Sequence, residues 1–505
     1  MSTIIDVLNN KAGTFCTKPI LRYRSYQLEY ALLLDRSDRF AGALRSLNFN
    51  AGDLIVTYLP NIPEFVTAYY GCLKAGCRII PMNLSFRKHE VKYIFNNPEV
   101  RGIIYWDRFE KKIKDILDEL STTPRLICVG ENRKIDCPQF ENLIDESPAI
   151  RAEEYPSEED EAVILFSSGT TGNPKGAVLT HASILESART ISNVFNYTSA
   201  DRILGALPLY NFIGHSAIMN AALLSGSEII LHTRFKPEEI VQSIFKTPIS
   251  VLIGTPEMYR QLIEHTESRN YNFSSLRIAI VSGDRIEEKL VEKFKQVFDL
   301  PLFQGFGCVE TTSLVSCAEL DNESAPNLLG KPFNNVEIKL LFNKNLVNET
   351  ATQFEGEFGE IAVKCPMNMK RYLHESSNIA EKNDNDWVQP RDICFLSEKG
   401  ELSYVGSYAD VILKGNYPVY ASEVESIILK MDDVKEVSVI GVPDKDHYRE
   451  LKAFVIPASG RKISKEQISA FCSERMPKYK VPKEIEFVEN FPKTIVGKVI
   501  KRFLK

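Results

Sequence analysis

The stretch FSSGTTGNPKGAVLTH, from Phe166 to His181, holds three glycines, two hydroxyl pairs and one lysine. Glycine lets the backbone approach an anion closely and point several N–H groups at it. The hydroxyls would add donors, and Lys175 would add a positive charge. The stretch therefore favours phosphate binding over its plainer alternative, a surface loop rich in Gly, Ser and Thr.

The stretch does not follow the common P-loop pattern, G-x-x-x-x-G-K-[ST], in which a hydroxyl residue comes directly after the lysine. Here Gly176 follows Lys175, and Pro174 precedes it. If this loop holds a polyphosphate, it therefore belongs to another architecture.

Length and composition limit the class of protein. A chain of 505 residues exceeds one ordinary core and indicates two or more domains. Its 44% hydrophobic and 25% charged residues are typical of globular proteins, and a net charge of −6 favours no nucleic-acid partner. No apolar run approaches the roughly 18 residues of a membrane span, and the start, MSTIIDVLNNKAG, lacks a signal-peptide pattern. We therefore expect a cytoplasmic protein.

The 10 cysteines are scattered along the chain. The closest pair, Cys72 and Cys77, lacks C-x-x-C spacing, and no zinc pattern is visible. Reduced thiols are the expected state.

Short apolar runs alternate with helical patterns. Candidate strands are residues 162–166, 228–231, 251–254 and 278–283. A helix is predicted from Pro237, with Ile240, Val241, Ile244 and Phe245 on one face, and another carries Leu290, Phe294 and Val297 at helical spacing. This alternation predicts an α/β fold with largely parallel sheets. Ligands of such folds lie beyond the carboxyl ends of strands, where FSSGTTG and VSGD both fall.

A domain boundary is predicted near Gly406. The pattern then changes to a helix near 422–431 and strands near 437–442 and 452–456. We expect a large multi-sheet α/β domain over 1–405 and a small, mobile α+β domain over 406–505.

Several motifs together resemble those of the adenylate-forming superfamily, which contains acyl- and aryl-CoA synthetases, luciferases and peptide-synthetase adenylation domains. FSSGTTGNPKGAVLTH resembles its phosphate loop, LPLYNFIG (207–214) its acyl-pocket motif, and VSGDRI (281–286) and QGFGCVETT (304–312) its adenine motifs. GEIAVKCPMNMKRY (359–372) is similar to the segment before its ribose motif, WVQPRDICFL supplies Asp392, and PKTIVGK supplies Lys498. The set covers nearly the whole chain and is highly specific.

The resemblance implies a reaction in two halves. A carboxylate attacks the α-phosphate of ATP and gives acyl-AMP and pyrophosphate. A thiol, from CoA or from the phosphopantetheine of a carrier protein, then attacks the acyl-AMP and releases AMP. The first half spreads negative charge around phosphorus, so positioned cations, including Mg²⁺, and hydrogen-bond donors matter most.

The resemblance also implies a role for each motif residue. Glu310 would hold Mg²⁺ through oxygen, and Lys498 would meet the α-phosphate during the first half. Without the resemblance, Glu310 is an ordinary surface carboxylate and Lys498 belongs to a basic tail. The acid pocket would include Asn211, Phe212, Gly214 and Gly254, and the hinge Ser407, Ala409 and Asp410. The nucleotide would contact Ser167, Ser168, Gly169, Thr170, Thr171, Gly172, Lys175, Gly283, Asp284, Arg285, Gln304, Gly305, Phe306, Gly307, Cys308, Val309 and Asp392.

The chain departs from the family pattern at four places. Val309 stands where Thr is common before the glutamate, and Asn211 where His or an aromatic residue is common. In GSYADVILKG, Ser407 replaces an arginine and Ala409 replaces the hinge Asp or Lys, while Asp410 remains. Asn416 stands near an expected glycine, with a register uncertain by one residue.

Three hypotheses fit these residues. The first is an acyl- or aryl-CoA synthetase, the second a stand-alone adenylation enzyme that loads a carrier protein, and the third a nucleotide-binding homologue without turnover. No Asp in PLYNFIG is available to meet an α-ammonium group, which disfavours an α-amino acid. Asn211 and Cys308 favour a short or aromatic acid.

Overall fold

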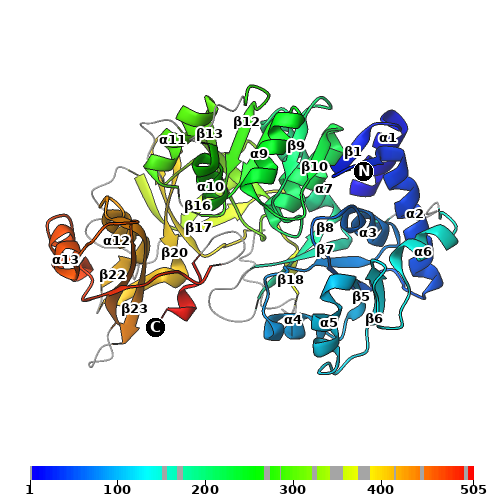
Figure 1. Cartoon of the computed structure of the whole chain (residues 1–505), viewed down its shortest axis with the longest axis horizontal. Coiled ribbons are helices and arrows are strands. Elements are labelled where there is room, and N and C mark those ends of the chain that lie inside the picture. Colours follow the sequence, from blue (N-terminus) through cyan, green and yellow to red (C-terminus); the bar gives the residue numbers. More distant parts are fainter. Residues whose placement is uncertain are drawn as a thin grey trace.

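The structure, a computed structural model, describes residues 3–150, 156–167, 174–266, 273–284, 286–320, 327–341, 356–373, 387–414, 417–443, 449–493 and 499–504. Figure 1 shows a large body with a smaller unit at one end, where the last part of the chain (orange to red) gathers. The mixed α/β architecture, with a large multi-sheet part and a small C-terminal α+β unit, confirms the predicted fold class. The exact boundary near Gly406 remains a prediction.

The larger sheet is 13-stranded, and its centre is parallel. The run from β13 to β1 pairs in parallel, and the strands beyond β13 pair antiparallel. In sheet order the strands are β16 (Glu337–Leu341), β17 (Gly356–Lys364), β19 (Asp392–Ser397), β20 (Leu402–Ser407), β15 (Leu328–Pro332), β14 (Leu314–Leu320), β13 (Leu302–Gly307), β12 (Ile278–Val281), β11 (Val251–Gly254), β9 (Arg202–Gly205), β10 (Glu228–Leu231), β1 (Pro19–Tyr23) and β2 (Tyr26–Glu29).

The second sheet is 7-stranded and carries the glycine-rich stretch. Strands β7, β4, β3, β5 and β6 are parallel, so their carboxyl ends share one edge. In sheet order the strands are β18 (Arg371–Tyr372), β8 (Gly176–Thr180), β7 (Glu161–Phe166), β4 (Arg78–Pro81), β3 (Leu54–Tyr58), β5 (Val100–Trp106) and β6 (Arg125–Val129).

Helices join the two sheets into one core. Helix α1 contacts α2, α3, α7 and α8, and the apolar residues of these helices belong to a single buried cluster. The large part contains α1 (Ile4–Thr14), α2 (Tyr30–Ser46), α3 (Pro63–Lys74), α4 (Lys88–Phe95), α5 (Glu110–Leu117), α6 (Phe140–Glu146), α7 (His181–Val194), the π-helix η2 (Gly214–Asn220), α8 (Ala221–Ser225), α9 (Pro237–Lys246), α10 (Pro256–Thr266) and α11 (Glu288–Phe298).

The predicted strands are present at β7, β10, β11 and β12, and both predicted helices form. One predicted helix face is wrong. On α9, Ile240, Val241 and Ile244 are buried, but Phe245 is 62% exposed. At about 100° per residue, Phe245 lies roughly a quarter turn beyond the centre of the other three, which places it outside the buried stripe. On α11, Phe298 is buried and Val297 is only half-buried.

The small unit packs α12 (Ala421–Ile428) and α13 (Lys465–Ser473) with the sheet β23 (Val434–Pro443), β24 (Arg449–Pro457) and β25 (Glu484–Phe487). The hairpin β21 (Val411–Lys414) and β22 (Tyr417–Tyr420) precedes it. The predicted helix is present but ends three residues earlier than expected, and both predicted strands are present and longer. The 10 cysteines are all free thiols, as predicted.

The two parts touch through a few side chains. The Arg87 guanidinium lies 3.6 Å from the ring centroid of Phe503, which belongs to the short 3₁₀ turn at Lys501–Phe503. The rings of Phe358 and Tyr420 lie 5.8 Å apart. Among the described helices, none combines the length and apolar character that crossing a bilayer requires.

Asp201 ties together the amino ends of the central parallel strands. It lies just before β9 and is 4% exposed. Arg277, just before β12, donates to both carboxylate oxygens at 2.8 Å, and the Ser250 hydroxyl, just before β11, donates at 2.7 Å. Burial alone would raise the pKa of Asp201, but these hydrogen bonds and that from the Thr198 N–H lower it to about 2.

We expect Asp201→Asn to lower the free energy of unfolding by about 2 kcal/mol near pH 7, since a carboxylate of lowered pKa stabilises the fold by roughly that amount. The stabilisation exists above the unfolded-state pKa of about 3.9 and is lost as pH falls toward the folded pKa of about 2. Differential scanning calorimetry at several pH values would measure it. The exposed Asp115→Asn is the control. A difference in Tm that stayed constant down to the lowest pH would contradict this assignment.

Candidate functional site

Four predicted site segments lie together at one edge of the larger sheet. Neighbouring parallel strands β13, β12, β11 and β9 end at that edge, and register places Gly254 opposite Val281 and Val281 opposite Gln304. Residues 206–211 follow β9 and residue 255 follows β11. Residues 282–284 follow β12, and residues 308–310 follow β13. This matches the expectation that ligands of α/β folds lie beyond the carboxyl ends of strands.

The glycine-rich stretch leaves the corresponding edge of the second sheet. Ser167 directly follows β7, and its N–H donates to the Lys175 carbonyl at 2.9 Å, which closes the loop at its base. Lys175 is exposed. Ser168, Gly169, Thr170, Thr171 and Gly172 lie outside the described residues, as do Arg285 and Lys498.

One segment, residues 365–373, joins these two edges. It leaves β17 of the larger sheet and ends as β18, which pairs antiparallel with β8 and sets Tyr372 opposite Ala177. The Met369 N–H donates to the Glu310 carbonyl at 2.8 Å, and the Leu373 N–H donates to the Gly176 carbonyl at 2.8 Å. The segment therefore fixes the turn at Glu310 against the end of the phosphate-loop stretch.

Tyr372 lies between the two charged residues of this junction. Its hydroxyl donates to Glu310 Oε1 at 2.9 Å. The Lys175 ammonium lies 4.9 Å from the centroid of its ring. Sequence reasoning gave Tyr372 no role of its own, and no sequence signal shows these contacts, because they depend on the pairing of β18 with β8.

The Glu310 carboxylate fits a magnesium ion. Mg²⁺ takes oxygen ligands and is commonly held by one or two carboxylates together with substrate phosphates. Glu310 is 9% exposed, and Tyr372 engages one of its oxygens. The turn around it is tight: Thr312 has φ of 60°, unusual for a β-branched residue. Val309, where the family commonly has Thr, is half-buried.

The segments expected to meet adenine surround the ends of β12 and β13. Gly283 has φ of 98°, a conformation that favours glycine, and Asp284 is exposed. A Cβ on Gly307 would approach the Ser313 carbonyl to 2.1 Å, so only glycine fits there. Phe306 is 9% exposed and packs in the large core, beside Gly305 and the buried Gln304. Burial raises the pKa of the Cys308 thiol well above its ordinary value.

Three of the four predicted acid-pocket residues follow β9. The Asn211 side-chain oxygen accepts the Ile213 N–H at 2.9 Å and so caps the following turn, while Phe212 is half-buried. A Cβ on Gly214 would lie 2.1 Å from the Pro208 carbonyl oxygen, which explains the glycine there. Gly254 ends β11 and is buried.

The chain then forms an unpredicted π-helix, η2, with a buried polar network. His215 Nε2 lies 2.7 Å from the Tyr69 hydroxyl, and the Asn220 side chain donates to the His215 carbonyl at 2.9 Å. Burial lowers the pKa of His215 to about 3, so the imidazole is neutral at physiological pH. π-helical turns are uncommon and concentrate at functional sites.

One predicted hinge residue, Ser407, pairs directly with the predicted ribose residue, Asp392. Asp392 begins β19, and Ser407 ends β20 as its cross-strand partner. The Tyr408 N–H donates to the Arg391 carbonyl at 2.8 Å, and the Arg391 guanidinium lies 5.2 Å from the Tyr408 ring centroid. Ala409 lies in the 3₁₀ turn Tyr408–Asp410.

The tail after the Lys498 segment is attached to this hinge. Lys501 pairs with Asp410 at 3.3 Å and with Glu425 at 2.9 Å. Burial alone would lower the pKa of Lys501, but Glu425 and Asp410 more than offset it and raise the pKa. Sequence reasoning predicted Asp410 as a hinge residue but not its ion pair.

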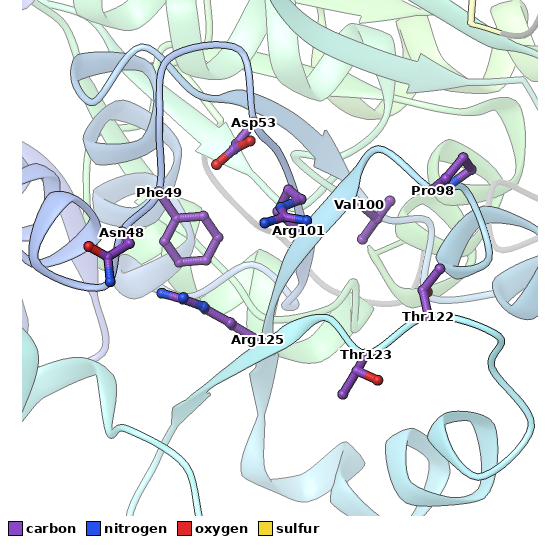
Figure 2. A pocket seen from close by; sticks show the side chains of 9 residues that line it. All are labelled: Asn48, Phe49, Asp53, Pro98, Val100, Arg101, Thr122, Thr123 and Arg125. Carbon is purple, nitrogen blue, oxygen red and sulfur yellow. The ribbon is translucent and has the colours of Figure 1, made fainter.

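A separate cavity of about 300 Å³ lies at the opposite edge of the second sheet. Figure 2 shows Arg101 and Arg125 near Phe49 in its lining. Val100 and Arg125 begin β5 and β6, so the cavity opens at the amino ends of these parallel strands. It is therefore distinct from the site at their carboxyl ends.

Comparison with known proteins agrees with this arrangement. The family model described as AMP-binding enzyme matches residues 8–373, and that of the AMP-binding enzyme C-terminal domain matches residues 423–498. A long-chain-fatty-acid–CoA ligase of Bacillus subtilis is 29% identical over 99% of this chain and 94% of its own. A feruloyl-CoA synthase of Amycolatopsis is 27% identical over 95% of this chain and 94% of its own.

Solved structures share the fold. The o-succinylbenzoate CoA synthetase of Bacillus subtilis, in complex with ATP and a magnesium ion, superposes with a TM-score of 0.85 at 25% identity, over 99% of this chain and 98% of that one. An anthranilate CoA ligase in complex with anthranoyl-AMP gives a TM-score of 0.88 at 23% identity, over 99% and 96%.

These matches confirm the predicted superfamily and the predicted enzyme class, an AMP-forming acid–thiol ligase. The family models cover most of the chain, including the segments that carry Lys175, Glu310 and Tyr372. The chain belongs to the family of AMP-binding enzymes, within the adenylate-forming superfamily.

Proposed function

We propose that this chain joins a carboxylic acid to the thiol of CoA at the expense of ATP, through an acyl-AMP intermediate. The observation that carries the proposal is that Tyr372 contacts both Lys175 and Glu310, and so brings these two residues into one site. A cation from a glycine-rich loop beside a carboxylate suited to Mg²⁺ is an arrangement for a metal-bound polyphosphate. The named relatives, which are CoA ligases and synthases, support the same reaction.

Each residue of the site then has a task. The loop from Ser167 to Lys175 would bind the β- and γ-phosphates, and Glu310 would hold Mg²⁺, which neutralises charge on the phosphates when bound. Asp392, at the start of β19, would accept both ribose hydroxyls. Lys498 would stabilise the charge that develops at the α-phosphate. Water would be excluded when the small unit closes over the nucleotide.

The acid is proposed to be short or aromatic. Asn211 and Cys308 are small polar residues near the expected pocket, and the amide oxygen of Asn211 is already used in a cap. The relatives' names span long-chain fatty acids and ferulate. Carboxylate-dependent ATP–pyrophosphate exchange, run across aliphatic and aromatic acids of increasing length, would test the reaction and rank the acids. If no acid supports exchange, the alternative without turnover takes its place.

The acceptor thiol could also belong to a separate carrier protein. Ser407 and Ala409 replace the residues that the family commonly has at its hinge. If these changes slow the reaction with free CoA, a carrier thiol becomes the better acceptor. Comparing CoA with a phosphopantetheinylated carrier, at equal thiol concentration, separates the two acceptors.

Lys498→Ala is expected to slow acyl-AMP formation by about 10²-fold or more, the scale for loss of one preorganised charge-stabilising group. The reaction of supplied acyl-AMP with thiol should stay nearly unchanged, because Lys498 is proposed to act in the first half only. Rapid-quench assays of each half-reaction would measure both rates. Lys493→Ala is the matched control, since this lysine of the same segment pairs with Glu436 at 2.7 Å. Equal losses in both half-reactions would refute the role of Lys498.

The double substitution Ser407→Arg with Ala409→Asp tests the hinge. If the hinge limits transfer to free CoA, the change should raise AMP release from preformed acyl-AMP and CoA more than it raises adenylation. Single-turnover assays would follow both steps. An unchanged rate, or a slower rate from a wild type that is already fast, would mean that the departures at 407 and 409 are compensated elsewhere. A wild type that is slow with CoA and fast with a carrier thiol would instead favour the carrier-loading alternative.

A further inference from the structure

We propose that Tyr372 is a positioning residue that keeps Lys175 and Glu310 apart and holds each in the orientation its ligand needs. Its hydroxyl orients the Glu310 carboxylate toward a divalent cation, and its ring orients the Lys175 ammonium toward phosphate oxygens. This inference rests on the proposed function. It adds a residue that acts through Lys175 and Glu310 and has no proposed contact with the reacting atoms.

The position of Tyr372 is fixed by backbone pairing on both sides. Register sets it opposite Ala177, and the next residue, Leu373, donates its N–H to the Gly176 carbonyl at 2.8 Å. This places the ring beside Lys175, which directly precedes Gly176. On the other side, the Met369 N–H donates to the Glu310 carbonyl at 2.8 Å. The same short segment is therefore hydrogen-bonded to the backbone beside both Lys175 and Glu310.

The neighbouring residue strengthens this anchor. Arg371 donates from Nε and Nη2 to the two carboxylate oxygens of Glu161 at 2.8 and 2.9 Å. A bidentate pair of this kind adds geometric specificity as well as energy. Because Glu161 begins β7, the pair ties β18 to the strand that leads into the phosphate loop.

Without Tyr372 between them, the Lys175 ammonium and the Glu310 carboxylate would attract each other. A lysine and a glutamate at one opening attract, and a direct pair would neutralise both groups before any ligand arrives. In the described part of the chain, Lys175 and Glu310 form no ion pair with each other. Instead, the Tyr372 hydroxyl takes one oxygen of Glu310 at 2.9 Å, and the ring lies 4.9 Å from the Lys175 ammonium. Each carboxylate oxygen has two lone pairs, so Glu310 can still accept a cation beside its contacts with the Tyr372 hydroxyl and the Cys308 thiol. The cation–π contact leaves the ammonium donors of Lys175 for phosphate.

Two substitutions separate the two contacts. Tyr372→Phe keeps the ring and removes the hydrogen bond to Glu310. Mg²⁺ should raise the affinity for ATP about tenfold less in this variant than in the wild type, the scale for residues that orient a metal ligand. The affinity for ATP without Mg²⁺ should stay unchanged. Tyr372→Leu removes the ring as well. It should weaken ATP binding without Mg²⁺ by about two- to fivefold, the scale for one exposed cation–π contact.

The measurement is isothermal titration calorimetry of the full-length chain with ATP, in the absence of any acid and at a series of MgCl₂ concentrations. Tyr23→Phe is the matched control, because Tyr23 ends β1 in the 13-stranded sheet and its hydroxyl lies 2.8 Å from the Thr233 hydroxyl. Thermal unfolding of every variant confirms that it is folded.

A double-mutant cycle shows through which group Tyr372 acts. In a Glu310→Gln background, the further change Tyr372→Phe should have no effect on the Mg²⁺ dependence, because its partner carboxylate is already absent. A purely structural role would instead give the same loss in both backgrounds.

The outcomes are distinguishable. If wild-type ATP binding does not respond to Mg²⁺, the proposed function fails and this inference fails with it. If wild-type binding responds to Mg²⁺ and Tyr372→Phe responds equally, only the inference is overturned. Additive losses in the double-mutant cycle would also overturn it.

Discussion

The pairing of Arg371 and Tyr372 with β8 is the contact on which the site depends. The phosphate-loop stretch belongs to the 7-stranded sheet, and the Glu310 turn belongs to the 13-stranded sheet. At β18, a segment that leaves the 13-stranded sheet pairs with the edge of the 7-stranded sheet. A register slip of one residue would turn Tyr372 to the opposite face of the strand. The Arg371–Glu161 pair and the Leu373 hydrogen bond oppose such a slip. The backbone pairing therefore sets the position of Tyr372 between Lys175 and Glu310.

Much of this fold could be predicted because its strands are short, buried apolar runs. The runs at β7, β10, β11 and β12 are almost wholly buried, so hydrophobicity alone marks them. The candidate site was predictable only as separate motifs, through resemblance. What the sequence could not show is contact between them: Tyr372 with Glu310, and Lys501 with Asp410, join residues far apart along the chain. The predictions at Phe245 and at 214–220 failed for other reasons. Helical geometry places Phe245 beyond the margin of the buried stripe, and the π-helix does not follow the 3.6-residue period.

The predicted hinge region lacks the arginine that the family commonly has at position 407, but two other cations, Arg391 and Lys501, lie close to it. Ser407 provides no guanidinium opposite Asp392, but Arg391, directly before β19, carries one that lies 5.2 Å from the Tyr408 ring centroid. Lys501 binds Asp410 and Glu425 with most of its side chain covered. The last turn of the chain is thus attached to the same 3₁₀ turn that contains Ala409. Any movement of this 3₁₀ turn is therefore coupled to residues 499–504 through Lys501.

The contact of Arg87 with Phe503 has a kinetic consequence. It joins the large part to the final turn of the small unit at 3.6 Å. If the small unit rotates between half-reactions, as the family resemblance implies, this contact breaks and reforms in every turnover. A cation–π contact at an exposed site is worth about 0.5–1 kcal/mol, which lengthens the dwell time of one orientation by only about two- to fivefold. A buried ion pair in its place would hold the unit long enough to make its release slower than the chemistry. A contact of this strength would be compatible with repeated opening.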